Sequence, residues 1–135
     1  MKDIIAPVPV DAIMEELTQE KFFRKTNNGG NEIYVLTAHE SPNIMREIGR
    51  LREISFRDSG GGTGLDCDID VFDTRDENFF YQLIVWNPVD HAIVGGYRFL
   101  LCDHLPVDAD GQVDTPTSEL FLYSKKFVEI GRAHV

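Results

Sequence analysis

The segment from Ile48 to Arg98 constrains the fold of this chain more than any other part of the sequence. It starts as a basic helical stretch, passes through a glycine loop and an acidic stretch, and ends in two β-rich runs. Four charged residues lie among apolar residues there: Arg52, Asp70, Asp73 and Arg98. Ordinary core packing does not require charged side chains at such positions. We therefore expect this segment to build a functional site.

The composition limits the class of protein. With 135 residues the chain is one domain or part of one, and 42% hydrophobic residues suit a packed globular core. The net charge of -10 argues against nucleic acid, whose phosphates need a basic surface, and against nonspecific docking on anionic lipid. A small local basic patch is compatible with both arguments, so peripheral contact with a membrane surface stays open.

Cysteine content and hydropathy point to a cytoplasmic protein. Cys67 and Cys102 are too few for a disulfide framework, and no C-x-x-C motif is present. Prolines and acidic residues interrupt the N-terminal stretch, so it lacks the apolar core of a signal peptide. No apolar run approaches the roughly 20 residues that span a bilayer.

Local patterns predict two helices and a strand in the first half of the chain. Asp11 is expected to cap a first helix that ends near Thr26, before a turn cluster rich in Asn and Gly. Residues 32–38 are β-rich and predict a strand. Ser41 is expected to cap a second helix, with Pro42 at its first position.

The second half is predicted to contain a loop and a β-hairpin. The loop is SGGGTG at residues 59–64, and the hairpin joins strands at 79–86 and 92–101 through a turn at 87–91. Helix, strand, helix and antiparallel hairpin together predict an α/β (α+β) fold with a central, mostly antiparallel sheet flanked by helices. Few residues follow Arg98, so we expect the fold to be incomplete at its C-terminus.

The glycine loop does not match a nucleotide-binding motif. A P-loop follows a strand and reads G-x-x-x-x-G-K-[ST], whereas this loop follows a predicted helix and has no Lys-Ser or Lys-Thr after it. Glycine freedom suits a mobile loop that closes over a substrate, and this is the interpretation we prefer.

Alternating acids follow the loop and resemble the opening of a calcium loop. Asp66, Asp68 and Asp70 would share one face of an extended segment. The sixth position of a calcium loop must be glycine, and here it is Val71, so we expect no metal. Asp66 and Asp68 are instead interpreted as a solvated acidic strand face.

Asp70 and Asp73 flank two apolar residues where the chain enters the core. Buried carboxylates need partners, and Arg52 and Arg98 are suitable because arginine binds carboxylates with two parallel hydrogen bonds. Two interpretations stay open from the residues alone. The cluster is either a structural ion-pair network or a site that shapes a pocket for an amine substrate or a thioester.

Three stretches of this block, GRLREISFR, DIDVFD and VGGYRFL, resemble a known enzyme family. The resemblance covers about residues 20 to 128. It is to the N-acyltransferases that depend on acyl carrier protein and are related to acyl-homoserine-lactone synthases, with a GNAT-like fold. Within that family the chain is most similar to the hemolysin-like branch, which acylates ornithine or glycine to make lyso-aminolipids.

The resemblance assigns site residues by position. Arg52 and Phe56 match the family's Arg-x-x-x-Phe, which implies substrate binding. Asp70 and Asp73 match its Asp-x-x-Asp, and Arg98 matches the arginine of its Gly-x-x-Arg strand. These last three are the implied catalytic residues, which in relatives line the cleft where the acyl thioester meets the amine.

The end of the chain also resembles the family, with a difference in spacing. Glu129 and Arg132 match a later Glu-Leu-Gly-Arg strand, which implies a general base and a further substrate-binding residue. The spacing from the preceding Ser-Lys-Lys-Phe is shorter than in relatives. We therefore hypothesise that residues 1–135 are the N-terminal portion of a single GNAT-like acyltransferase domain and that 129–135 are a non-native tail.

The implied reaction transfers a (3-hydroxy)fatty acyl group from acyl carrier protein to the amine of an amino acid such as ornithine or glycine, the first step of aminolipid synthesis. No bound cofactor is implied, and acyl carrier protein, or acyl-CoA in its place, supplies the acyl group. No pyrophosphate loop for coenzyme A is visible. Carrier-protein docking would need a local basic patch. The charges available for it, which otherwise form a solvated basic face, are Arg46, Arg50, Arg57, Lys125 and Lys126.

Two other functions compete with this one. A lysophospholipid-type O-acyltransferase would use the same donor chemistry, because these residues do not distinguish an amine from an alcohol acceptor. A non-catalytic acyl-binding or regulatory domain would keep the site without turnover. Whether this chain is active by itself is also left open.

Overall fold

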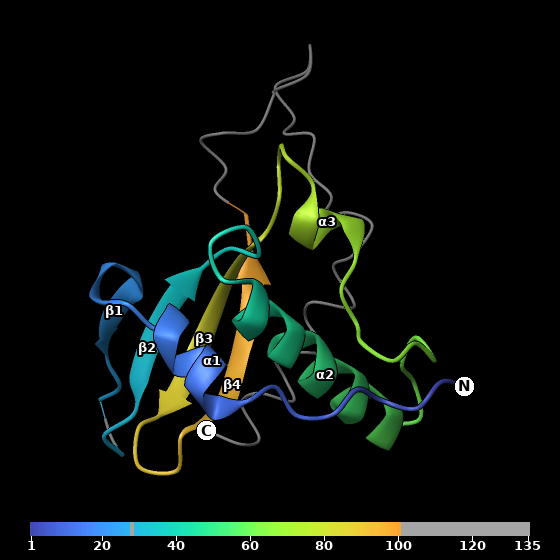
Figure 1. Ribbon diagram of the computed structural model, residues 1–135, viewed down its shortest axis with the longest axis horizontal. Coiled ribbons are helices and arrows are strands. Elements are labelled where there is room, and N and C mark those ends of the chain that lie inside the picture. Colours follow the sequence, from blue (N-terminus) through green and yellow to red (C-terminus); the bar gives the residue numbers. More distant parts are fainter. Residues whose placement is uncertain (28, 101–135) are drawn as a thin grey trace.

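The computed structural model describes residues 1–27 and 29–100 (Figure 1). Their elements follow the order helix, strand pair, long helix, short helix and strand pair. The bounds are α1 Val10–Glu16, the 3-10 turn η1 Gln19–Lys21, β1 Phe22–Lys25, β2 Glu32–Leu36, α2 Pro42–Asp58, α3 Val71–Thr74, β3 Tyr81–Asn87 and β4 Ala92–Phe99.

The described strands form one antiparallel sheet in the order β1-β2-β3-β4. Tyr34 of β2 lies opposite Ile84 of β3, and Gln82 of β3 lies opposite Arg98 of β4. Gly96 is required where β4 pairs with β3, because a Cβ there would lie 2.4 Å from the Leu83 carbonyl oxygen. The predicted mostly antiparallel sheet and its β3–β4 hairpin are confirmed.

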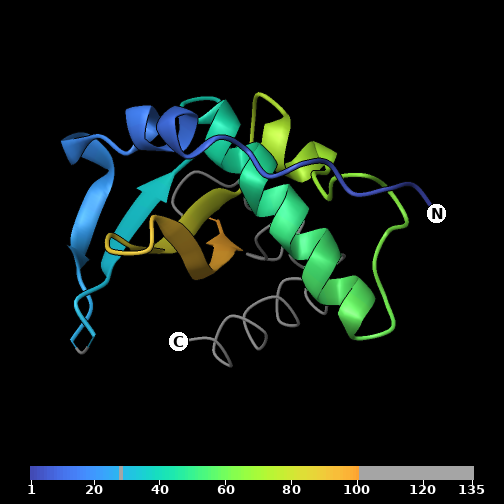
Figure 2. The ribbon, with the colours of Figure 1, turned by 60° about the horizontal axis from the view of Figure 1, so that its bottom comes forward.

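Helices α1 and α2 cover the same face of the sheet (Figures 1 and 2). Apolar side chains from α1, α2, β2 and β3, with one from the segment before α1, form one buried cluster there. Removing their surface from water is the main source of stability. The buried members of the cluster are Val8, Ile13, Tyr34, Leu36, Ile44, Met45, Ile48, Ile84 and Trp86.

The N-terminal segment, residues 1–9, runs along α2 towards the glycine loop (Figure 2). The Lys2 N–H donates to the Gly64 carbonyl at 2.9 Å, and the Ile5 N–H donates to the Asp66 carbonyl at 3.0 Å. Further along, the Val8 N–H donates to Glu47 Oε1 at 3.2 Å. These bonds tie the chain start to the segment that precedes the site.

The prediction of a first helix ending near Thr26 is wrong. Helix α1 ends at Glu16, and residues Phe22–Lys25 form β1, which pairs with β2. The Phe22 ring makes an edge contact with Tyr34 at 5.6 Å between centroids. Cross-strand aromatic pairing of this kind stabilises a sheet, and it outweighs the helical pattern that the sequence suggested.

The predicted N-cap of α1 at Asp11 is wrong, because Pro9 is its N-cap residue and the helix starts at Val10. Ser41 is the N-cap residue of α2 as predicted, but its side chain makes no capping hydrogen bond. For α2 the cap comes from Glu16, whose carboxylate accepts from the Ile44 N–H at 2.8 Å and the Asn43 N–H at 3.1 Å. The predicted start of α2 at Pro42 is confirmed.

The stretch from 66 to 72 is not a plain extended segment with one acidic face. Residues Val71–Thr74 form the short helix α3, and Asp70 caps it. Asp68 is 4% exposed, so the prediction of a solvated face is wrong for this residue, whereas Asp66 is exposed. Among the helices of residues 1–27 and 29–100, none has the length and apolar character needed to cross a membrane.

Candidate functional site

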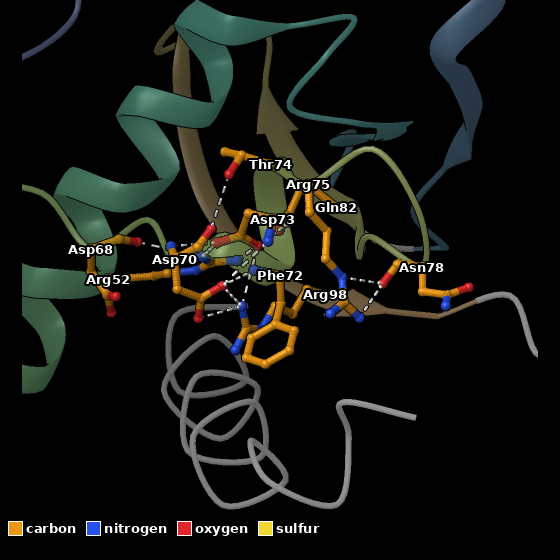
Figure 3. A network of polar contacts seen from close by, with 10 residues as sticks. All are labelled: Arg52, Asp68, Asp70, Phe72, Asp73, Thr74, Arg75, Asn78, Gln82 and Arg98. Atoms are coloured by element: carbon orange, nitrogen blue, oxygen red, sulfur yellow. Dashed lines mark hydrogen bonds and ion pairs between the residues drawn. The ribbon is translucent and has the colours of Figure 1, made fainter. Parts of the chain in front are cut away.

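Four elements meet at a buried polar network (Figure 3). Arg52 comes from α2, Asp73 from α3, Gln82 from β3 and Arg98 from β4, and all four side chains are buried. Together with Asp70, the cap of α3, we call them the arginine–aspartate network. The network joins the long helix to the two C-terminal described strands.

Arg52, Asp73 and Gln82 form a closed triangle of hydrogen bonds. Arg52 Nη1 donates to Asp73 Oδ2 at 3.0 Å, and Arg52 Nη2 donates to Gln82 Oε1 at 2.7 Å. Gln82 Nε2 completes the triangle by donating to Asp73 Oδ1 at 2.8 Å. Charges this deeply buried persist only with such partners, so each member holds the other two in place.

Arg98 links the two aspartates. Its Nη1 atom donates to both oxygens of Asp70 at 3.0 Å and to Asp73 Oδ1 at 3.2 Å. The guanidinium also lies over the Phe80 ring, 4.4 Å from its centroid. The predicted pairing of Asp70 and Asp73 with Arg52 and Arg98 is confirmed.

The same aspartates also hold α3. Asp70 Oδ1 accepts from the N–H groups of Phe72 and Asp73, and Asp73 Oδ2 accepts from the Asp70 N–H, which is a reciprocal capping box. Burial by itself would raise the pKa of Asp73, but Arg52, Arg98 and these hydrogen bonds hold it below its ordinary value. Asp73 is therefore an anion that orients its neighbours.

Gln82 is a site residue that the sequence analysis did not identify. It occupies an inward position of β3, between the buried Phe80 and Ile84. In the sequence, the polar amide of Gln82 at an inward position of an otherwise apolar strand was the feature that could have indicated a site residue.

Glu53 closes the glycine loop and was also missed. Its buried carboxylate accepts from the Thr63 N–H at 2.9 Å, the Thr63 hydroxyl at 2.6 Å and the Gly64 N–H at 3.1 Å, and it pairs with Arg57. Burial would raise the pKa of Glu53, but these bonds lower it to about 2. Gly62 (φ +97°) approaches so closely that a Cβ there would lie 2.9 Å from Glu53 Oε2.

Phe56 lies one helical turn after Arg52 and is 1% exposed. Its carbonyl accepts from the Gly61 N–H at 2.7 Å, which fixes the first part of the glycine loop. The structure therefore places Phe56 in the interior beside the loop.

Asp68 differs from the other acids of the site. Its carboxylate oxygen Oδ2 is buried and has no hydrogen-bond partner among the described residues. Burial is the main cause that raises the pKa of Asp68, to about 6. Within residues 1–27 and 29–100, no group of His, Cys, Asp and Glu side chains is arranged to hold a metal ion.

Comparison with known proteins identifies the family. Residues 51–135, more than half of the chain, match the family model of the acetyltransferase (GNAT) domain. The chain belongs to the GNAT family. The predicted GNAT-like α/β fold is thereby confirmed.

Two curated relatives resemble this GNAT chain over its whole length. A glycine N(alpha)-acyltransferase of Phocaeicola vulgatus is 47% identical over 143 residues, which cover 100% of this chain and 44% of the relative. A glycine N(alpha)-acyltransferase of Bacteroides thetaiotaomicron is 46% identical, with 42% of its length covered. The chain thus spans less than half the length of the curated relatives it matches. No solved structure is significantly similar to it.

The residues predicted for carrier-protein docking differ in their exposure and in their ion pairs. Arg46 is exposed on α2. Arg50 donates to both carboxylate oxygens of Glu47, at 2.7 and 2.6 Å, and Arg57 pairs with Glu53, so these two charges are already matched. The remaining predicted site residues lie outside the described part of the chain: Lys125, Lys126, Glu129, Arg132 and the whole of 129–135.

Proposed function

We propose that this GNAT chain is part of an enzyme that transfers a (3-hydroxy)fatty acyl group to the amine of an amino acid. Glycine is the first acceptor to consider and ornithine the second. The observation that carries the proposal is the 47% identity, along the whole chain, to a glycine N(alpha)-acyltransferase. That similarity includes the segment that builds the arginine–aspartate network. The reaction would be the first step of aminolipid synthesis.

The chemistry sets two requirements. A neutral amine must attack the thioester carbonyl and lose a proton, and the oxyanion that develops must be stabilised. Each oxygen of Asp73 already accepts hydrogen bonds, and its low pKa keeps it ionised at neutral pH. Asp73 is therefore poorly suited to take up the proton.

We assign Asp70, Asp73, Arg52 and Arg98 a positioning role in this reaction. Their ion pairs fix α3 relative to α2 and β4. The hydrogen bonds of Gln82 attach the start of β3 to the same network. A preorganised arrangement of this kind lowers the entropic cost of orienting the acyl donor and the amine acceptor. Of these charges, Asp70 is the most accessible, because its side chain is 31% exposed.

We propose acyl carrier protein as the donor, with acyl-CoA as the alternative. Arg46 is the exposed positive charge on α2 in the described structure, and it is available to an acidic carrier protein. The net charge of -10 opposes this docking, so a local contact has to overcome it.

The proposal is tested by supplying the purified protein with a 3-hydroxyacyl carrier protein or with the matching acyl-CoA. Glycine, ornithine and a lysophospholipid serve as acceptors, and mass spectrometry identifies the product. N-acylglycine or N-acylornithine supports the proposal, and the donor that gives the faster rate identifies the acyl source. Product from the lysophospholipid alone would show an O-acyltransferase. Binding of the acyl donor without any product would show a non-catalytic acyl-binding domain.

A further inference from the structure

The charges of the arginine–aspartate network cancel among the described residues. Two arginines, Arg52 and Arg98, face two aspartates, Asp70 and Asp73, and every one of the four takes part in an ion pair. Asp68 is a third carboxylate next to this balanced set (Figure 3). The nearby Glu53 does not change the balance, because Arg57 pairs with it.

The main chain of Asp68 is fixed on α2. Its N–H donates to the Gly49 carbonyl at 3.0 Å, and its carbonyl accepts from Arg52 Nη1 at 3.5 Å. Gly49 permits this approach, since a Cβ there would lie 2.6 Å from Cys67 Sγ and 2.7 Å from the Ile69 side chain. The segment around Asp68 is therefore packed against the helix backbone, and its carbonyl group contacts Arg52 of the network.

A buried carboxylate oxygen without a donor is unfavourable, because it loses its hydration and gains nothing in return. Asp68 is 4% exposed, and no described residue donates to its Oδ2. The raised pKa of Asp68, about 6, expresses the same deficit. No residue in the described part of the chain satisfies this oxygen, and a ligand with a cationic N–H donor can do so.

The other carboxylates of the site are not available for this role. Both oxygens of Asp73 already accept hydrogen bonds from side chains and backbone. Both oxygens of Asp70 bind Arg98, and Glu53 is occupied by the glycine loop. Among the described acids of the site, Asp68 alone has a buried oxygen that lacks a donor.

We propose that Asp68 receives the ammonium group of the amino-acid acceptor. The inference rests on the proposed function and specifies its acceptor site. An ammonium group brings three N–H donors and one positive charge, which satisfies Asp68 Oδ2 and neutralises the third carboxylate. Such a contact selects a free primary amine, and it excludes an acceptor whose nitrogen is already acylated.

The test uses the Asp68→Asn variant, which keeps the shape of the side chain and removes its charge. Asp66→Asn is the matched control, because Asp66 is exposed and lies two residues away. Apparent KM for glycine and kcat are measured for the wild type and both variants, and calorimetry measures glycine and N-acetylglycine binding directly. Circular dichroism and the KM for the acyl donor report whether each variant is folded.

Asp68→Asn is expected to weaken glycine binding and raise the glycine KM by about tenfold or more, with the donor KM unchanged. Asp66→Asn should behave as the wild type, and N-acetylglycine should not bind. Glycine binding by Asp68→Asn equal to that of the wild type would overturn the inference while leaving the proposed function intact. A wild type that acylates no amine at all would instead remove the proposed function, and this inference with it.

Discussion

Arg52 and Asp73 form an ion pair of 3.0 Å between Nη1 and Oδ2 in which the side chains are 1% and 0% exposed. They lie 21 residues apart in the sequence, on α2 and α3. Such a pair adds little stability over an apolar replacement, but loss of one partner leaves the other as an uncompensated buried charge. The pair therefore determines where α3 can sit.

The first prediction concerns this pair. Asp73→Ala leaves Arg52 without its carboxylate and should reduce the free energy of unfolding by roughly 3–5 kcal/mol. Urea denaturation followed by circular dichroism measures the change. Asp76→Ala, at an exposed position near α3, is the control. A loss below about 1 kcal/mol for Asp73→Ala would show that the pair is not buried as described.

The second prediction concerns the cap of α2. Glu16→Ala removes the acceptor of the Asn43 and Ile44 N–H groups and should cost about 1 kcal/mol in the free energy of unfolding. Glu15→Ala, one residue earlier and exposed, should change it by less than about 0.5 kcal/mol. Equal effects of the two substitutions would show that Glu16 does not cap the helix.

The third prediction concerns pH and Glu53. Its folded pKa of about 2 is below the unfolded value near 4.5, so its contribution to stability is complete above the unfolded pKa and is lost as pH falls towards 2. Urea denaturation between pH 7 and pH 2.5 should show this loss in the wild type. In Glu53→Gln the decline over the same range should be shallower, and an identical decline would contradict the assignment.

The fourth prediction has the opposite sign and concerns Asp68. Its folded pKa of about 6 is above the ordinary aspartate value, so Asp68 favours folding while protonated and disfavours it as pH rises through 6. Asp68→Asn should therefore stabilise the protein at pH 7.5, by roughly 2 kcal/mol, and much less at pH 4. A variant that is less stable than the wild type at pH 7.5 would refute this reading of the site.

The sequence predicts the elements whose determinants are local. Pro42 marks the start of α2, and the turn at 87–91 separates two β-rich runs, so both features follow from neighbouring residues. The pairing of Asp70 and Asp73 with Arg52 and Arg98 was also predictable, because charges in apolar company require partners.

Features that depend on distant residues were not predictable in this way. The cap of α2 comes from Glu16, 27 residues before Asn43, and no local pattern indicates it. Asp68 was placed on a solvated face because its neighbours alternate, but packing on Gly49 buries it. Gln82 acquires its role only when β3 lies beside α2 and α3.

The central claim is that the arginine–aspartate network organises an acyl-transfer site, and Arg98 tests it most directly. The measurement is the rate of N-acylglycine formation from a 3-hydroxyacyl carrier protein by the wild type and by Arg98→Ala, with the fraction folded determined for both by urea denaturation. The account predicts product from the wild type and a rate at least roughly a hundredfold lower per folded Arg98→Ala molecule. Near-normal turnover by folded Arg98→Ala would contradict it.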